Sequence, residues 1–246
     1  MRVVFANKNF VLNYFLPFLF LVIFSCESSS QNGEIASENG LTDTIPKHAR
    51  SHDTTAADLF RGEIRSEAKT SFVNAVADTF ESIKKLQNWL PSDEYMHKST
   101  DAKHNNTPRT SEENHNVYLS DLYIFGVKKE DDNDYHLILA SSKKLEKDQP
   151  YFSAEISGLP DSTSQFFPTL SKVRNTFLSY FGADANKEYV FVASAKHPPI
   201  HLLYIKGSLF FDNHHFGAHS SVKGFKVCSA WEIHPVIAIQ FDGNYR

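Results

Sequence analysis

Apolar and polar residues divide the chain into stretches of different periodicity. Residues 10–24 are apolar almost without interruption, whereas residues 27–55 are mostly small and polar. From residue 56 to residue 91 apolar side chains recur at steps of three and four, which predicts an amphipathic helical segment, with an interruption allowed near Thr70-Ser71 and an end at Pro91. We expect its apolar face to pack on its own domain rather than on a partner helix. Residues 92–115 are polar again and are predicted to form a loop.

The rest of the chain is predicted to be rich in β-structure. Strands are indicated where β-branched and aromatic residues lie between turn residues: 117–127, 135–140, 151–157, 189–194, 201–211 and 231–241. Residues 168–181 instead place apolar side chains on one helical face, with Pro168 at the start and Gly182 after the end. The sequence therefore predicts one helix within a series of strands.

The order of these elements predicts the fold class. Three strands, a helix and two further principal strands is the order of an OB barrel, whose helix falls between strands three and four. The strand at residues 189–194 is additional to that plan, and a small mixed sheet with the helix on one face is the competing architecture. We predict an α+β, mainly β fold: an OB-like five-stranded barrel at residues 116–246, preceded by an N-terminal amphipathic helix.

The N-terminal residues 1–25 have the pattern of an export signal. Arg2 and Lys8 precede the apolar run, and a basic start followed by a short apolar core is typical of such signals. A membrane-spanning helix needs about 20 apolar residues, so this run is too short to be read as one. Residues 26–55 hold too little apolar surface to offset their ordering entropy and are predicted to be a disordered tether.

A cysteine follows the apolar core directly. The residues Leu21-Val22-Ile23-Phe24-Ser25-Cys26 resemble the lipobox of bacterial lipoproteins, in which the cysteine is acylated and becomes the first residue of the mature chain. The resemblance implies that lipid on Cys26 holds the protein to a membrane of the cell envelope. Glu27, in place of the aspartate that signals inner-membrane retention, favours the outer membrane. Ordinary signal cleavage with an unmodified cysteine is the alternative.

Charge and cysteine content narrow the possible partners. Removal of residues 1–25 leaves 23 basic and 29 acidic side chains, a formal charge of −6. Such a chain is poorly suited to nucleic acid, where many phosphates must be neutralised, or to charge-driven lipid attachment. If Cys26 carries lipid, Cys228 has no partner in the chain, and we expect it to be a buried small apolar residue. The expected partners are the bilayer and an unidentified ligand or protein.

Two short clusters could carry chemistry. Asp134 and His136 lie two residues apart at one predicted strand, and Glu232 and His234 lie two apart at another. Alternate residues of a strand share a face, so each pair is expected to point the same way.

These clusters belong to a wider resemblance. A group of uncharacterised bacterial proteins carries an acidic turn before a D-x-H-L strand, then A-E-I, G-x-x-F-F-D-x-x-H and E-I-H-P-V strands. The corresponding segments here are residues 130–137, 154–156, 207–215 and 232–236. The resemblance covers residues 117–239 and brings no established activity with it.

The clustered residues allow two interpretations. Imidazole and carboxylate ligands could hold a divalent metal, and the candidates are His136, His215, His234 and Glu232. Catalysis, if present, would use His136, Glu232 and His234. The other interpretation, which we favour, is a buried polar network that fixes strand register and includes Asp134, Glu155 and Asp212.

The motifs present favour a binding domain. A staphylococcal-nuclease mechanism needs arginines that clamp the phosphate, and no arginine lies in a predicted barrel strand. The chain also lacks a G-x-S-x-G elbow and a glycine-rich phosphate loop. We therefore expect a membrane-anchored envelope lipoprotein that carries a β-barrel binding domain. A metal-dependent hydrolase, nuclease-like or a phosphoesterase, is the alternative.

Overall fold

The computed structural model describes residues 65–100, 108–146, 148–217, 221–227 and 229–243. The predicted signal at residues 1–25, the predicted tether with Cys26, the beginning of the predicted helical segment, and Cys228 lie outside the described residues.

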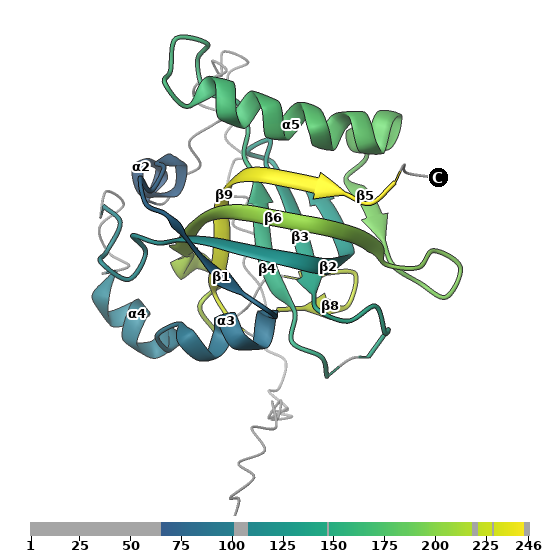
Figure 1. Ribbon diagram of the computed structural model, residues 1–246, viewed down its shortest axis with the longest axis horizontal. Helices are drawn as coiled ribbons and strands as arrows, with labels where there is room; N and C mark the ends of the chain where they lie inside the picture. Colours follow the sequence, from purple (N-terminus) through teal and green to yellow (C-terminus); the bar gives the residue numbers. More distant parts are fainter. Residues whose placement is uncertain (1–64, 101–107, 147, 218–220, 228, 244–246) are drawn as a thin grey trace, which may run out of the picture. The chain divides into compact units, whose positions relative to one another are not determined.

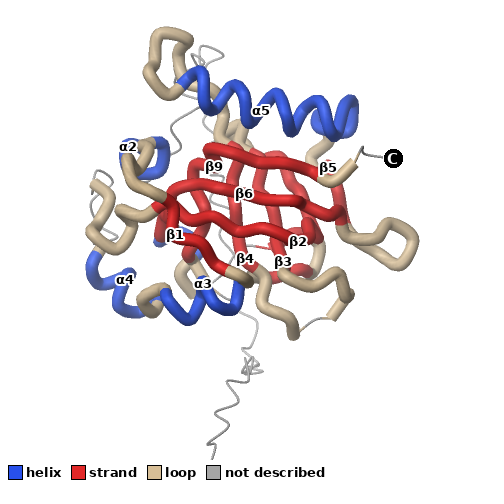
Figure 2. Tube along the Cα trace, viewed as in Figure 1, coloured by secondary structure: helices blue, strands red, loops and turns tan. Residues whose placement is uncertain are grey.

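Five strands close into a barrel (Figures 1 and 2). They are β2 (Asn116–Lys129), β3 (Tyr135–Ala140), β4 (Phe152–Ile156), β6 (Ile200–Phe211) and β9 (Trp231–Phe241). Neighbouring strands follow the order β2-β3-β4-β9-β6, and β6 pairs back onto β2. The β4–β9 pair is parallel and the other barrel pairs are antiparallel, so the barrel is mixed. The predicted mainly β fold with a five-stranded barrel is confirmed, and the sheet is closed rather than open.

A helix connects the third and fourth barrel strands, as predicted. It is α5 (Phe167–Phe181), continued by the 3-10 turn η1 (Gly182–Asn186), and it runs alongside β9 (Figure 1). The apolar face expected from the sequence is buried; Phe177 packs on Tyr135 of β3 with ring centroids 4.3 Å apart. The Tyr135 hydroxyl donates a hydrogen bond to the carbonyl of Ala185, 3.1 Å away, which joins η1 to the barrel.

Smaller elements extend the barrel at β2. The strand β5 (Tyr189–Val192) pairs antiparallel with β2, and β1 (Ala77–Phe80) pairs parallel with its first residues. The connection from β6 to β9 holds the 3-10 turn η2 (Asn213–His215) and a hairpin of β7 (Ser221–Val222) and β8 (Phe225–Lys226).

The predicted amphipathic helical segment at residues 56–91 is not one continuous helix in the part that the structure describes, and its first break falls at Thr70, where an interruption was predicted. Helix α2 (Ser66–Thr70) ends after five residues, β1 follows, and α3 (Ile83–Trp89) begins only after it. The Asn116 side-chain amide donates to the carbonyls of Val73 and Ala75, at 2.7 and 2.8 Å, and holds this stretch extended. Long-range pairing therefore overrides the local periodicity, and Val76 of the predicted apolar stripe is 93% exposed.

The predicted loop at residues 92–115 also contains a helix, α4 (Asp93–Ser99). Ser92 caps it by accepting a hydrogen bond from the Tyr95 backbone N–H, 3.3 Å away, and Met96 is fully buried. Seven residues are too few for a helical periodicity to show in a polar stretch.

Among the described helices, none combines the length and the apolar character that crossing a membrane requires.

Candidate functional site

Polar side chains gather on one face of β3, β4 and β9. Successive side chains of a strand point to opposite faces, so His136 lies on the face of β3 opposite Tyr135 and α5. The structure brings His136 together with the other residues singled out on these strands, and each of the five is at most 3% exposed. The five are Asp134, His136, Glu155, Glu232 and His234.

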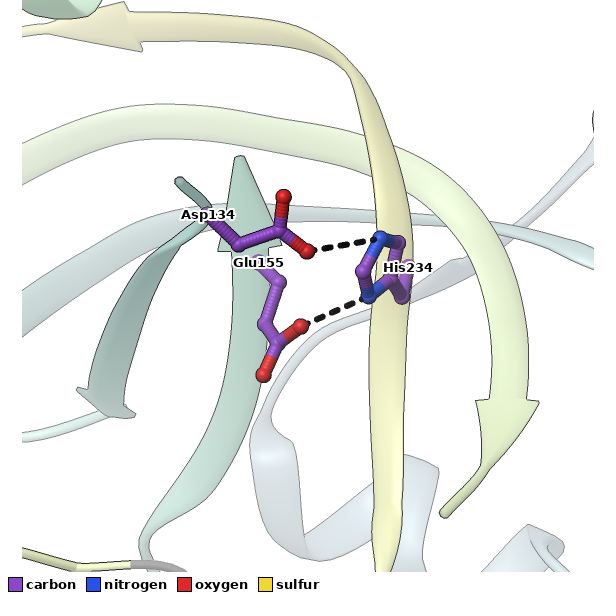
Figure 3. Close-up of side chains that lie close together, drawn as sticks. All are labelled: Asp134, Glu155 and His234. Carbon is purple, nitrogen blue, oxygen red and sulfur yellow. Dashed lines mark ion pairs between the residues drawn. The ribbon is translucent and has the colours of Figure 1, made fainter. Parts of the chain in front are cut away.

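Glu155 connects the strands of this face. It lies opposite His136 in the β3–β4 register, and its Oε1 is 3.0 Å from His136 Nδ1. Its Oε2 is 2.8 Å from Nδ1 of His234, which reaches across from β9 (Figure 3). One carboxylate thus joins three neighbouring strands, as expected of a polar network that fixes register.

Both histidine rings are engaged at their second nitrogen as well. His136 Nε2 lies 3.3 Å from the Ser153 hydroxyl, and His234 Nε2 lies 2.8 Å from the Ser157 hydroxyl. Asp134 approaches the same nitrogen of His234 at 3.6 Å (Figure 3). A metal ligand keeps one imidazole nitrogen for the ion, so this arrangement resembles a closed hydrogen-bond network more than a prepared metal site.

Lys69 of α2 adds a cation that the sequence did not suggest. Its ammonium lies 3.0 Å from Glu155 Oε2, 3.5 Å from Asp134 Oδ2 and 3.4 Å from Asp132 Oδ2. The side chain is only 14% exposed, so α2 covers the polar face with a buried charge. No local signal marks Lys69, because its partners lie more than sixty residues away in the sequence.

The protonation of the cluster follows from burial and from Lys69. Burial alone would raise the pKa of Glu155, but Lys69 and His234 hold it well below its usual range. Burial raises the pKa of Asp134 to about 8, and burial together with the charge of Glu155 raises the pKa of Glu232 well above its usual range. Burial also lowers the pKa of His234. At neutral pH the cluster therefore centres on one ionised pair, Glu155 with Lys69.

A second group lies at the more exposed edge of the same face. Asp212, His215 and Glu232 hold ligand-type atoms within 4.8 Å of one another, as do Asp134, Glu155 and His234 in the buried group. His215 Nδ1 is 3.1 Å from Asp212 Oδ2, and these side chains are 33% and 15% exposed. The His215 and His136 rings are 6.2 Å apart, so the two groups are adjacent.

A buried ion pair lies beside the cluster, and the sequence did not predict it either. Arg65 donates from Nη1 and Nη2 to the two oxygens of Glu113, at 2.7 and 2.6 Å. Glu113 also accepts from the backbone N–H groups of Phe211 and Thr110, at 2.9 and 2.7 Å. Arg65 is 1% exposed and Glu113 is fully buried.

Two further arginines donate hydrogen bonds to backbone carbonyl groups of the protein. Arg109 donates to the carbonyls of His234 and Ser71, at 2.7 and 3.0 Å, and to the carbonyl of Leu209; burial lowers its pKa to about 10. Arg174 of α5 donates to the carbonyl of Ser157 at 2.9 Å. These guanidinium groups stabilise the ends of the barrel strands, and sequence spacing gives no sign of such contacts.

Comparison of the chain with protein-family models, with curated proteins and with solved structures finds no match.

Proposed function

We propose that this protein is a lipoprotein of the bacterial cell envelope, held by lipid on Cys26 in the outer membrane, and that its barrel is a non-catalytic binding domain of the OB type. The ligand is an unidentified partner or small molecule, and it is not nucleic acid.

The strand order supports the OB assignment. In chain order the barrel strands are β2, β3, β4, β6 and β9, and in space the fifth lies between the third and the fourth. The third and fifth strands are parallel, and the helix α5 joins the third to the fourth. An OB barrel has its helix at this connection.

The position of the polar cluster carries the binding proposal. OB barrels bind ligands on the face of strands two and three and with the loops that join strands one to two and four to five. Here His136 and Glu155 lie on the second and third barrel strands. Asp134 comes from the first of these loops, and Asp212 and His215 come from the second. The polar residues therefore come from the strands and loops that OB barrels use to bind ligands, which supports a binding role for this side of the barrel.

The charges of this face argue against nucleic acid. Acidic side chains outnumber the cationic Lys69, and Arg65, Arg109 and Arg174 direct donors at a buried carboxylate or at carbonyl oxygens. A phosphate track would need such cations to face outward. A ligand with cationic or hydrogen-bond-donating groups fits the face better.

The anchor is tested by replacing the acylated residue. We expect full-length protein expressed in a Gram-negative host to incorporate labelled palmitate and to sediment with outer membranes. Cys26→Ser should abolish incorporation and move the protein to the soluble periplasmic fraction, because the acidic surface supplies no other attachment. Cys228→Ser is the matched control and should leave both readouts unchanged. Incorporation that persists in Cys26→Ser would refute the anchor.

A hydrolysis assay separates the binding domain from the metal-dependent hydrolase. Because each nitrogen of His136 and His234 already faces a protein group, we expect no cleavage of bis(p-nitrophenyl) phosphate above background with added Mn²⁺ or Zn²⁺. His234→Asn and the exposed-site control His197→Asn should both match the unaltered protein. Cleavage that is lost in His234→Asn but kept in His197→Asn would establish the hydrolase instead.

A further inference from the structure

Glu232 carries a buried carboxylate oxygen with no partner. Its Oε1 lies 3.3 Å from His234 Nδ1, but Oε2 accepts no hydrogen bond from any described residue, and the side chain is 1% exposed. Leaving a buried oxygen unpaired is costly, and such groups in native proteins often mark a missing ion or ligand.

Asp212 and His215 stand next to this oxygen. Asp212 directly follows β6 and is held in place because its Oδ1 accepts from the His214 backbone N–H at 2.9 Å. His215 follows in the short turn η2, and the three side chains bring ligand-type atoms within 4.8 Å of one another. Unlike the buried group, this one reaches the surface through the ring of His215, which is 33% exposed and gives an ion a way in.

The two groups differ in the cation that they already hold. Glu155 and Asp134 have the ammonium of Lys69 at 3.0 and 3.5 Å, so an ion at the buried group would have to displace it. No lysine or arginine of the described residues lies within ion-pair distance of Asp212 or Glu232. At the outer group the partners of Asp212 and Glu232 in these ion-pair contacts are histidines, at 3.1 and 3.3 Å, so no ammonium or guanidinium would have to be displaced by an ion.

We propose that Asp212, His215 and Glu232 bind one divalent transition-metal ion, with Zn²⁺ as the best fit. Two carboxylates and one imidazole are a three-ligand set of the kind that Zn²⁺ takes with a fourth position left to water or a ligand. Ca²⁺ and Mg²⁺ prefer an all-oxygen shell with more ligands than this edge supplies. The inference rests on the proposed binding face, because the ion would be the group through which that face holds its ligand.

The experiment uses the full chain, purified in detergent with a tag that contains no histidine. We expect about one Zn²⁺ per chain by mass spectrometry of the metal, and a rise in melting temperature when Zn²⁺ is added to the stripped protein. His215→Ala should weaken Zn²⁺ binding by about 100-fold or more. His214→Ala, at the exposed neighbouring histidine, should bind as the unaltered protein does.

A second variant guards against misfolding. Glu232→Gln should also lose Zn²⁺ binding; because Glu232 is buried, this result counts only if the far-ultraviolet circular dichroism spectrum of the variant is native. His215 is partly exposed, so His215→Ala should fold normally. Sub-stoichiometric Zn²⁺, or binding that survives His215→Ala, would overturn the site. Binding that is lost in Asp134→Asn but kept in His215→Ala would assign the ion to the buried group and also overturn it. A protein that binds no Zn²⁺ can still be anchored through Cys26 and can still lack phosphodiester cleavage, and each of these is measured by its own experiment. The site and the proposed function therefore fail separately.

Discussion

Glu113→Gln is expected to lower the free energy of unfolding by about 3–5 kcal/mol, the cost of leaving a buried charge without its partner. The carboxylate accepts four hydrogen bonds, two from Arg65 and two from backbone N–H groups. Glutamine keeps the shape but loses the charge, and its amide group would face donors that also need an acceptor. The guanidinium of Arg65 would then stay buried without the carboxylate that accepts from both of its Nη atoms.

Urea unfolding followed by tryptophan fluorescence measures this change, because Trp231 is 1% exposed and reports on the barrel. Glu112→Gln is the matched control: Glu112 is adjacent but only partly buried, and it accepts a hydrogen bond from Tyr95 at the surface. It should shift the midpoint only slightly. Equal midpoint shifts for the two variants would show that the Arg65–Glu113 pair contributes little.

Gly207→Ala is expected to destabilise the barrel by more than about 3 kcal/mol, at the upper end of overpacking costs. A Cβ at position 207 would lie 2.4 Å from Ile233 Cγ2 and 2.6 Å from the Pro235 carbonyl oxygen. The Cγ2 atom belongs to a fully buried β-branched side chain that is stiff at χ1. The carbonyl belongs to the backbone of β9 and cannot move without disturbing the pairing of β6 with β9. The register of the β6–β9 pair shifts at Gly207, so a side chain at this position would push β6 and β9 apart and open the barrel between them.

Resistance to limited proteolysis and the urea midpoint measure the loss. Leu203→Ala serves as the control on the same strand, because Leu203 is 37% exposed and its truncation removes little packing. A Gly207→Ala variant with native protease resistance would mean that β9 can shift to accept the methyl group.

The sequence predicted the barrel because each of its strands carries its own signal. The segments expected to form the barrel strands and α5 agree with the structure to within two residues at each end. The acidic turn before β3 and the pair Glu232 and His234 can likewise be recognised from the local sequence. Because side chains alternate along a strand, each pair was expected to lie on one face of its strand. Glu155 joined them because the antiparallel register sets it opposite His136.

The rest depended on partners that are distant in sequence. Four residues form β1, with no alternation to identify it, and its pairing partner lies almost forty residues later. Lys69 and Arg65 lie in the stretch that the sequence predicts to be an amphipathic helical segment, and their roles come from carboxylates on β4 and before β2. The sequence pattern of one segment does not show which charged side chain of a distant segment will contact it. The cations that complete the cluster are therefore visible only in the structure.

Helix α2 also determines how the domain responds to mechanical load. A force applied at Arg65, the first described residue, acts on a side chain whose guanidinium donates to Glu113 and to the carbonyl of Phe211. One helical turn later, Lys69 holds Glu155 on β4. Tension therefore acts across two buried ionic contacts at once and does not peel a strand from the edge of the sheet. If the protein is held at a membrane through Cys26, as we propose, the contacts of α2 are expected to break under load before the strands of the barrel separate.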